Sequence, residues 1–346
     1  MHKAILAFVI LSTMFSTAQA ADFSVNADFG YRNDKLEINN AELNRDRLRY
    51  QLKLSAEVND KTKVMLGVRT GSTKSAWTDM GDGNSLKGAG LNLAYVEYAA
   101  ADNVNVTLGK MHQPWVMEGL MFDPDIKPEG LAVALKNENG LSASAFKLKL
   151  AENGFNEDSS LVGLQLGAAK KIADVDVAVH AALLNQEINT GVELCYVFPL
   201  SVSDGAPVFI LPVCSSVLKH EQLVLSASAT KEVDGLPVKL FVQQLKNDEA
   251  KLADTALVYG VKFGAVKKAG DWELSIMKQD AEANSLSSVW TDSDFGSEAV
   301  LHNGTAIRAA YGLADGWAVR GSYFDVEVGA AKRDYKRLMV DLVYSF

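Results

Sequence analysis

Two groups of charged residues have the types and spacing that electrostatic selection of ions requires. Arg47 and Arg49 alternate along one segment, so they would share one face of a strand, and Arg69 follows in the next segment. Acidic residues gather in residues 112–129 against a single lysine: Glu118, Asp123, Asp125 and Glu129. An acidic segment facing a basic wall across a passage would create a transverse field that selects among ions. A solvated acidic surface loop is the alternative interpretation.

The sequence offers little for covalent or metal chemistry. It contains no Gly-x-Ser-x-Gly nucleophile motif and no His-Glu-x-x-His zinc motif. Beyond residue 20, four histidines stand outside any such motif: His112, His180, His220 and His302. The Asp-x-Asp segments 123–125 and 292–294 could supply calcium oxygens, but neither has a full calcium-loop signature, so we interpret both as turns. We therefore expect no enzyme activity, no cofactor and no metal.

The two cysteines, Cys195 and Cys214, flank an apolar stretch with a hairpin-turn signal, Asp204-Gly205, midway between them. If the protein is exported, its compartment is oxidising, and we expect a disulfide. Pairing outward from the turn would make the cysteines a hydrogen-bonded pair with wide Cα spacing, and prolines interrupt the ladder. We therefore predict the disulfide and leave open whether a regular ladder forms between the cysteines. The apolar stretch would pack onto its own domain or bind a partner.

The first twenty residues have the anatomy of a secretory signal peptide. Lys3 precedes an apolar run over residues 4–14, and Ala18-Gln19-Ala20 forms a small-x-small cleavage site. The run is too short to cross a bilayer, so a retained anchor is the less favoured alternative. We expect cleavage after Ala20 and a single domain over residues 21–346.

Composition excludes several classes of protein. A net charge of −9 argues against a nucleic-acid binder, which would carry a basic patch. Two cysteines exclude a disulfide-dense scaffold and a four-cysteine zinc site. The mean hydropathy of +0.01 is far below that of a polytopic helical membrane protein.

Alternation of apolar and polar residues with a period of two dominates the remaining sequence. Leu48, Tyr50 and Leu52 share one face of a segment whose other face carries the arginines. The last segment alternates in the same way and ends on Phe346. We count sixteen such segments, mostly about 8–12 residues long, which suits tilted transmembrane strands.

Two of these segments have ambiguous faces. Residues 89–98 could point Leu91, Leu93 and Tyr95 outward, or Ala94, Val96 and Tyr98. In residues 141–150 two lysines share the alanine face. We therefore expect the outer face to consist of Phe146, Leu148 and Leu150.

The predicted connections alternate in length. Links after even-numbered strands are short, whereas the longest links follow odd-numbered strands: 33–46, 71–88, 112–129, 185–221 and 280–304. This parity predicts an all-β fold, a 16-stranded antiparallel transmembrane β-barrel with short periplasmic turns and long extracellular loops. A secreted two-sheet β protein is the alternative.

A barrel of this size leaves an aqueous channel, and the expected inner face carries charges that no dry core would tolerate. These are Arg47, Arg49, Lys53, Glu57, Arg69, Arg308, Arg320, Arg337 and Asp341. Aromatic residues near strand ends suit an interfacial girdle: Tyr50, Tyr98, Trp272, Trp317, Tyr344 and Phe346. We therefore expect a water-filled lumen.

With these features the chain resembles Gram-negative outer-membrane porins, in particular those catalogued as putative porins. The sharper local match is Leu108-Gly109-Lys110-Met111-His112-Gln113-Pro114-Trp115 followed by residues 122–130, which resembles the end of the fifth strand and the third loop of such porins. The Pro-Glu-Phe-Gly-Gly run of enterobacterial general porins is absent. The resemblance implies a third loop folded into the lumen, a homotrimer, and Phe346 as a signal read by the barrel-assembly machinery.

The function expected from this resemblance is passive diffusion of ions and small hydrophilic solutes through an outer-membrane channel, with a weak preference for cations. Outer-membrane lipid, the assembly machinery and the solutes are the expected partners. A substrate-selective porin is the first alternative. A structural or adhesive barrel without conductance is the second.

Overall fold

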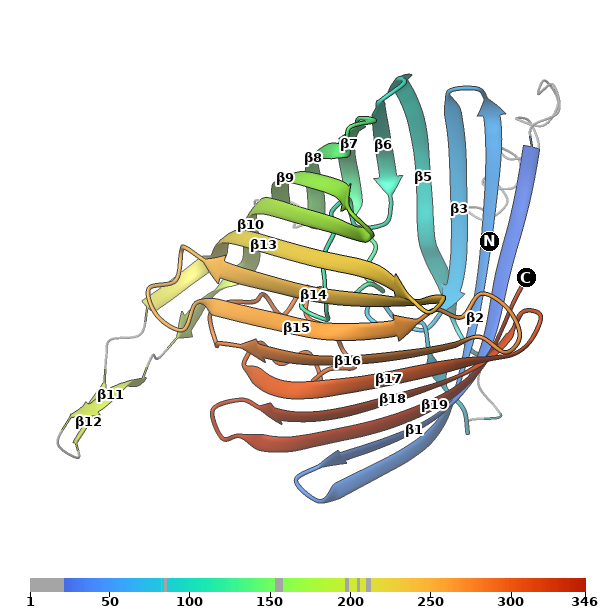
Figure 1. Ribbon diagram of the computed structural model, residues 1–346. Coiled ribbons are helices and arrows are strands. Elements are labelled where there is room, and N and C mark those ends of the chain that lie inside the picture. The colour runs from blue at the N-terminus through green and yellow to red at the C-terminus, as the bar shows by residue number, and fades with distance from the viewer. Residues whose placement is uncertain are drawn as a thin grey trace.

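The computed structural model describes residues 22–81, 83, 86–152, 158–196, 199–203, 206–209 and 213–346, and only the backbone from 190 to 218. Its regular elements are β-strands (Figure 1). No helix among the described residues is long and apolar enough to cross a membrane.

Sixteen long strands form one wall. They are β1 (Asp22–Ile38), β2 (Ala41–Asn59), β3 (Thr62–Thr70), β5 (Ala89–Ala101), β6 (Val104–Lys110), β7 (Glu129–Lys136), β8 (Leu141–Ala151), β9 (Ser159–Ile172), β10 (Val175–Tyr196), β13 (Val213–Val233), β14 (Leu236–Asn247), β15 (Thr255–Gly264), β16 (Trp272–Ala281), β17 (His302–Ala314), β18 (Trp317–Val328) and β19 (Arg333–Ser345). Three short strands complete the set: β4 (Thr78–Asp79), β11 (Pro199–Ser203) and β12 (Ala206–Phe209).

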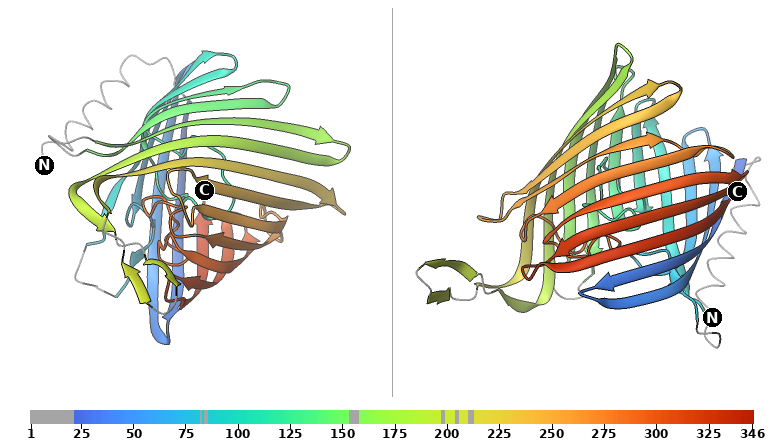
Figure 2. Two further views of the ribbon diagram at one scale, coloured as in Figure 1. Left: turned by 90° about the vertical axis from the view of Figure 1, so that its left-hand side faces the viewer. Right: turned by 60° about the horizontal axis from the view of Figure 1, so that its bottom comes forward.

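The wall closes on itself. Each wall strand pairs antiparallel with the next, and β19 pairs with β1 from Asp28↔Ser345 to Ile38↔Tyr335 (Figure 2). The predicted all-β, 16-stranded antiparallel barrel is therefore confirmed. Closure removes the free edges that an open sheet would present.

Two of the predicted long loops are largely strand. The loop expected at 33–46 is a two-residue turn at Asn39 and Asn40, both with positive φ, because β1 and β2 continue past the membrane-length segments. The loop expected at 185–221 is replaced in large part by extensions of β10 and β13, with the β11–β12 hairpin beyond them. Both predictions ended the strands where the alternation of apolar and polar residues stops. In the structure, backbone pairing between β1 and β2 and between β10 and β13 continues beyond that point.

The inner and outer faces follow the predicted alternation in most strands. In β5, a bulge at Asn92 shifts the register between Gly67 and Val68 of β3, so Leu91 lies outward before it, and Val96 and Tyr98 lie outward after it. Each alternative reading of β5 was thus correct for one part of the strand.

The prediction for β8 was wrong. Phe146 and Leu148 are buried on the inner face, and Leu150 packs against the same core, whereas Lys147 and Lys149 are exposed on the other side. The inner face of this strand is apolar because it packs against a loop inside the barrel.

Five of the six predicted girdle aromatics expose more than a third of their surface: Tyr50, Tyr98, Trp272, Trp317 and Phe346.

Candidate functional site

Three loops fold into the barrel and contact one another. They are the 71–88 loop, through its residues 71–77, the 111–128 loop and the 282–301 loop. The Asp123 amide donates to the Trp290 carbonyl at 2.6 Å, and the Ser293 hydroxyl donates to the Lys74 carbonyl at 2.9 Å. The Ala76 amide donates to the Asp125 carboxylate at 3.3 Å. Each loop is therefore bonded to both of the others.

Inward-facing glutamines hold the 111–128 loop in place. The amides of alternate loop residues, Val116, Glu118 and Leu120, donate to side-chain oxygens of wall residues at 2.8–3.1 Å. The acceptors are Gln165 on β9, Gln243 on β14 and Gln279 on β16. The contacts lie on three separate strands, so this part of the loop crosses the interior, with a turn at Gly119, whose φ is 70°.

The 282–301 loop is held by the same kind of residue. The amide of Gln186 on β10 donates to the Ser287 hydroxyl at 3.0 Å and its oxygen accepts from the Trp290 indole at 3.0 Å. Gln222 on β13 donates to the Ser285 carbonyl at 2.8 Å. All five glutamines are almost fully buried. A buried amide can satisfy a loop backbone group that water no longer reaches.

Apolar side chains of the 111–128 and 282–301 loops form a core with the inner wall. Trp115 lies against Phe122, Phe146 and Trp290, with ring centroids 4.9–5.9 Å apart. Phe295 packs on Phe324 of β18 at 6.1 Å. The water-filled lumen expected from the sequence is thus replaced, over this part of the interior, by a hydrophobic core.

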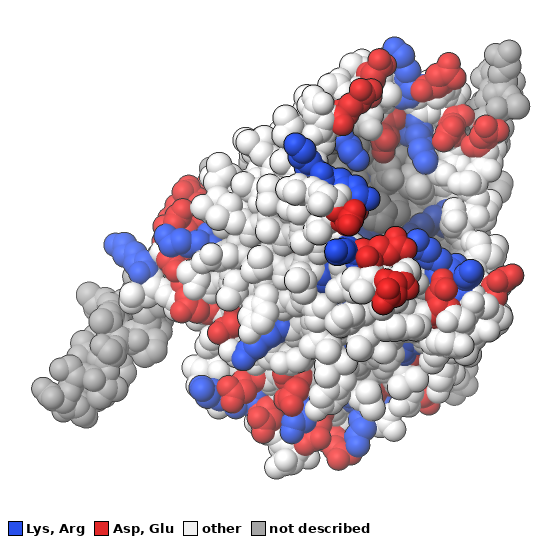
Figure 3. Space-filling model, viewed as in Figure 1, with Lys and Arg blue, Asp and Glu red and all other residues white. Residues whose placement is uncertain are grey.

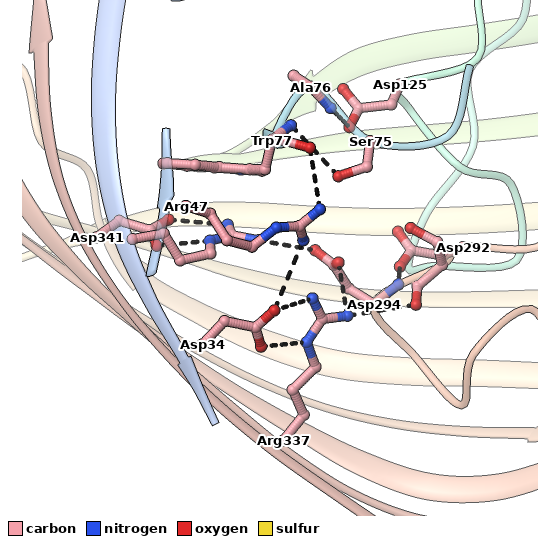
Figure 4. Close-up of polar contacts among 12 residues, drawn as sticks. Asp34, Arg47, Ser75, Ala76, Trp77, Asp125, Asp292, Asp294, Arg337 and Asp341 are labelled. Carbon is pink, nitrogen blue, oxygen red and sulfur yellow. Dashed lines mark hydrogen bonds and ion pairs between the residues drawn. The ribbon is translucent and has the colours of Figure 1, made fainter. Parts of the chain in front are cut away.

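Charged residues gather on the part of the wall formed by β1, β2 and β19 (Figure 4). The Asp34 side chain has no exposed surface and accepts two bonds from Arg337 at 2.8 Å each. Arg45 lies 2.9 Å and Arg47 3.6 Å from the same carboxylate. A buried charge is tolerated only when it is paired in this way.

Two loops are attached to this charged wall. Asp294 of the 282–301 loop pairs with Arg337 at 3.0 Å and lies 3.8 Å from Arg32. Trp77 of the 71–88 loop packs its ring 4.2 Å from the Arg32 guanidinium and 4.9 Å from that of Arg49. A Cβ atom at residue 30 would lie 2.6 Å from the Trp77 ring, which explains why Gly30 stands there.

The predicted acidic residues do not face the predicted arginines as one group. Asp125 pairs with Arg69 at 2.8 Å, whereas Glu118 pairs with Lys239 of β14 at 2.6 Å. Asp123 is buried between loops, and Glu129 begins β7 and pairs with Lys110. The predicted selectivity at these acids remains a prediction.

The other two predicted arginines pair with acids outside the 111–128 loop. Arg47 lies 2.7 Å from Asp79, and Arg49 lies 2.9 Å from Asp28. The charges that the sequence suggested would face a passage are therefore largely neutralised by neighbours on the wall and the 71–88 loop.

The two Asp-x-Asp segments lie together. The amide of Ser293 donates to Asp123 at 3.3 Å, and that of Asp294 donates to Asp292 at 2.7 Å. Burial, with neighbouring carboxylates, raises the pKa of Asp123 to about 7 and that of Asp292 to about 8. Among the described residues, no group of three or more His, Cys, Asp or Glu side chains could hold a metal ion.

Sequence reasoning missed the glutamines, Asp34, Asp294 and Trp77. A signal was available for four of the five glutamines, because Gln165, Gln222, Gln243 and Gln279 stand at inward positions of predicted strands. Gln186 lies in the 185–221 segment that was predicted to be a loop. The side chains of Cys195 and Cys214 lie outside the described residues, although the backbone register places the two positions opposite each other. The predicted signal peptide, residues 1–20, also lies outside them.

Comparisons with known proteins agree with this architecture. The profile of the family described as "Putative porin" matches residues 13–184. No curated protein matches the chain. Among solved structures, the chain is similar to OprB of Pseudomonas putida, with a TM-score of 0.63, 10% identity and coverage of 94% of both chains.

Two further structures share the fold. OmpF of Salmonella typhi, solved with daunomycin, gives a TM-score of 0.56 at 11% identity over 94% of this chain and 98% of that one. A mutant of Rhodopseudomonas blastica porin gives 0.51 at 12% identity over 94% and 100%.

Proposed function

We propose that this chain is a porin that carries ions and small hydrophilic solutes across the outer membrane by passive diffusion, because residues 13–184 match the putative porin family and the barrel shares its fold with solved porins. Family and fold point to a channel rather than an enzyme. No energy source or cofactor is needed for this function.

The observation that carries the proposal is the set of three loops bonded to each other inside a closed sixteen-stranded wall. A barrel of this size has room for an aqueous path, and the in-folded loops reduce its cross-section. Solutes are then selected first by size.

Charge selection is the second element of the mechanism. The weak cation preference expected from the acidic loop depends on Glu118, Asp123, Asp125 and Glu129. Direct pairing with Lys239 and Arg69 reduces the field that Glu118 and Asp125 can project into water. The proposed preference is correspondingly small, and its sign is measured by the reversal potential under a salt gradient.

A substrate-selective porin is the second candidate. The specific observation in its favour is the hydrophobic core that the 111–128 and 282–301 loops build against the wall. This core narrows the interior more than a single in-folded loop would, so the path is expected to exclude larger solutes.

The cellular setting belongs to the same proposal. We infer the outer membrane of a Gram-negative bacterium, export through a signal peptide over residues 1–20, and assembly by machinery that reads Phe346. A homotrimer and a Cys195–Cys214 disulfide complete it.

Planar-bilayer recording on refolded protein tests the proposal. Stable conductance steps support the channel, and three correlated steps indicate a trimer. Absence of conductance in protein whose heat-modifiable migration on gels demonstrates a folded barrel would favour a structural role. Liposome swelling with sugars of graded size then separates a general from a selective pore.

A further inference from the structure

A polar pocket of about 290 Å³ lies between the 111–128 loop and the ends of β3, β5 and β6. These strand ends lead into the 71–88 and 111–128 loops, so the pocket lies toward the extracellular side of the barrel. Ser72, Thr73 and Asn92 line it together with four charged residues. Small-molecule sites measure roughly 300–1,000 Å³, so a solute held in this pocket is small.

Arg69 shapes the pocket. Its guanidinium donates to the carbonyls of Ser72 and Thr73 at 2.8 and 2.9 Å. It also donates to the Asp125 carboxylate at 2.8 Å and to the Asp125 carbonyl at 3.2 Å. The same carboxylate accepts from the Ala76 amide (Figure 4). Arg69 therefore fixes both loop segments that frame the pocket to the end of β3, and its own donors are used in doing so.

Two lysines supply the remaining positive charge of the lining. Lys110 pairs with Glu129 at 2.9 Å and donates to the Lys127 carbonyl at 3.0 Å. The Lys127 ammonium donates to the Pro124 carbonyl and has no carboxylate within ion-pair distance among the described residues. A carbonyl leaves the charge of an ammonium group uncompensated and uses one of its three donors. Lys127 is therefore able to bind a further acceptor.

Positive charge exceeds negative charge around the pocket. Lys53, on the inner face of the adjoining strand β2, also lies outside ion-pair distance of every described carboxylate. The two carboxylates at the pocket are both paired, as described above. Burial lowers the pKa of Lys127, and the charges of Arg69 and Lys53 lower it further, whereas Asp125 and Asp123 act in the opposite direction. An ammonium group in such surroundings is stabilised by an additional anion.

We propose that this pocket is a subsite for a small solute with a phosphate or carboxylate group, which Lys127 binds together with Lys110 and the hydroxyls of Ser72 and Thr73. Bonds from ammonium groups to anionic oxygens are stronger than those between neutral groups. The inference rests on the proposed channel and names one class of solute for it. A weak preference for cations reflects the field along the whole path, whereas the subsite acts on an anion that has entered the pocket.

The pocket has a suitable place on the path of a solute. A solute that enters from the extracellular side meets the loops that frame the pocket. At the opposite end, which carries the short turns, the barrel is hollowed and bordered by charged side chains of both signs (Figure 3). A charged solute therefore meets polar surface at both ends.

Planar-bilayer recording with inorganic phosphate as the probe tests the subsite. Phosphate is added at neutral pH and constant ionic strength to channels that conduct in potassium chloride. We expect a saturable reduction of the current, with half-block at about tenfold more phosphate in Lys127→Gln, the effect of one charge-assisted hydrogen bond. Lys127→Arg should retain the block. Glu129→Gln, which frees Lys110, should lower the half-block concentration. Lys262→Gln, which removes an interior lysine of β15 that pairs with Glu273, is the matched control.

Three results would overturn the proposal. The first is an equal half-block concentration in Lys127→Gln and Lys262→Gln. The second is an unchanged half-block concentration in Glu129→Gln, a variant that tests the subsite by gain rather than by loss. The third is conduction in potassium chloride by the unmodified protein without any effect of phosphate. This third result would leave the proposed channel intact, so failure of the subsite is distinguishable from failure of the channel.

Discussion

The glutamine contacts to the 111–128 loop allow a sharp test of how the channel is narrowed. We consider Gln243→Leu and Gln279→Leu, which keep side-chain volume but remove the acceptor of a buried loop amide. Both glutamines have no exposed surface, and their bonds to the Glu118 and Leu120 amides are 2.8 and 3.1 Å long. The lost oxygens lie at fully buried positions of the wall, where water has poor access to replace them.

The magnitude follows from the cost of an unsatisfied buried donor, about 1–3 kcal/mol for each bond. This raises the population of the undocked loop by roughly 5- to 150-fold for each variant. The two contacts support one segment, so their effects should not be additive. The double variant should therefore differ from the sum of the single variants.

Single-channel recording in planar bilayers is the assay. The variants should show larger or additional conductance levels and more open-channel noise, and liposome swelling should extend to larger sugars. Gln51→Leu, on the inner face of β2 and outside the set bonded to the loop, is the matched control. Conductance, noise and solute limit identical to the unmodified protein in the double variant would refute the view that these glutamines hold the constriction.

Four further predictions follow from individual contacts. The folded loops raise the pKa of Asp123 and Asp292, so the stabilisation from these two carboxyl groups is full below their unfolded pKa of about 3.9 and is lost as pH rises through about 7 to 8. Conductance and proteolysis of the loops should therefore increase over that pH range. The increase should be smaller in the double variant Asp123→Asn/Asp292→Asn. Glu118→Gln leaves Lys239 unpaired and should shift the reversal potential toward anions, whereas an unchanged potential would contradict a role in selection. Asp34→Ala removes the shared partner of buried arginines and should cost about 3–5 kcal/mol, measured as a lower unfolding temperature on gels. Non-reducing mass spectrometry should detect a Cys195–Cys214 peptide, and free thiols at both positions would contradict the disulfide.

Much of the fold could be predicted from local pattern. A period of two, turns after even-numbered strands and the count of sixteen all depend on residues close together in the chain, and the closed barrel confirmed them. Strand ends were less predictable at the β1–β2 hairpin, because pairing there continues after the apolar alternation stops.

The faces of β5 and β8 show a different limit. A bulge at Asn92 changes which side chains face outward, and a bulge leaves no mark in a simple alternating pattern. Phe146 and Leu148 read as lipid-facing because an apolar residue in a barrel strand normally faces lipid. The partner of Phe146 is Trp115, on a loop about thirty positions earlier, and only the fold of that loop brings it there.

By itself the sequence determined the barrel, the alternation of short turns and long loops along it, and the segments that carry charge. These follow from residue alternation and turn residues, which are local properties of the chain. The tertiary structure decided which charges remain free, because an ion pair such as Arg337–Asp34 joins the two ends of the chain across the β19–β1 closure. It also decided what narrows the interior. Three loops distant in sequence meet there, and their buried backbone groups must be satisfied by whichever wall side chains the closed barrel places opposite them.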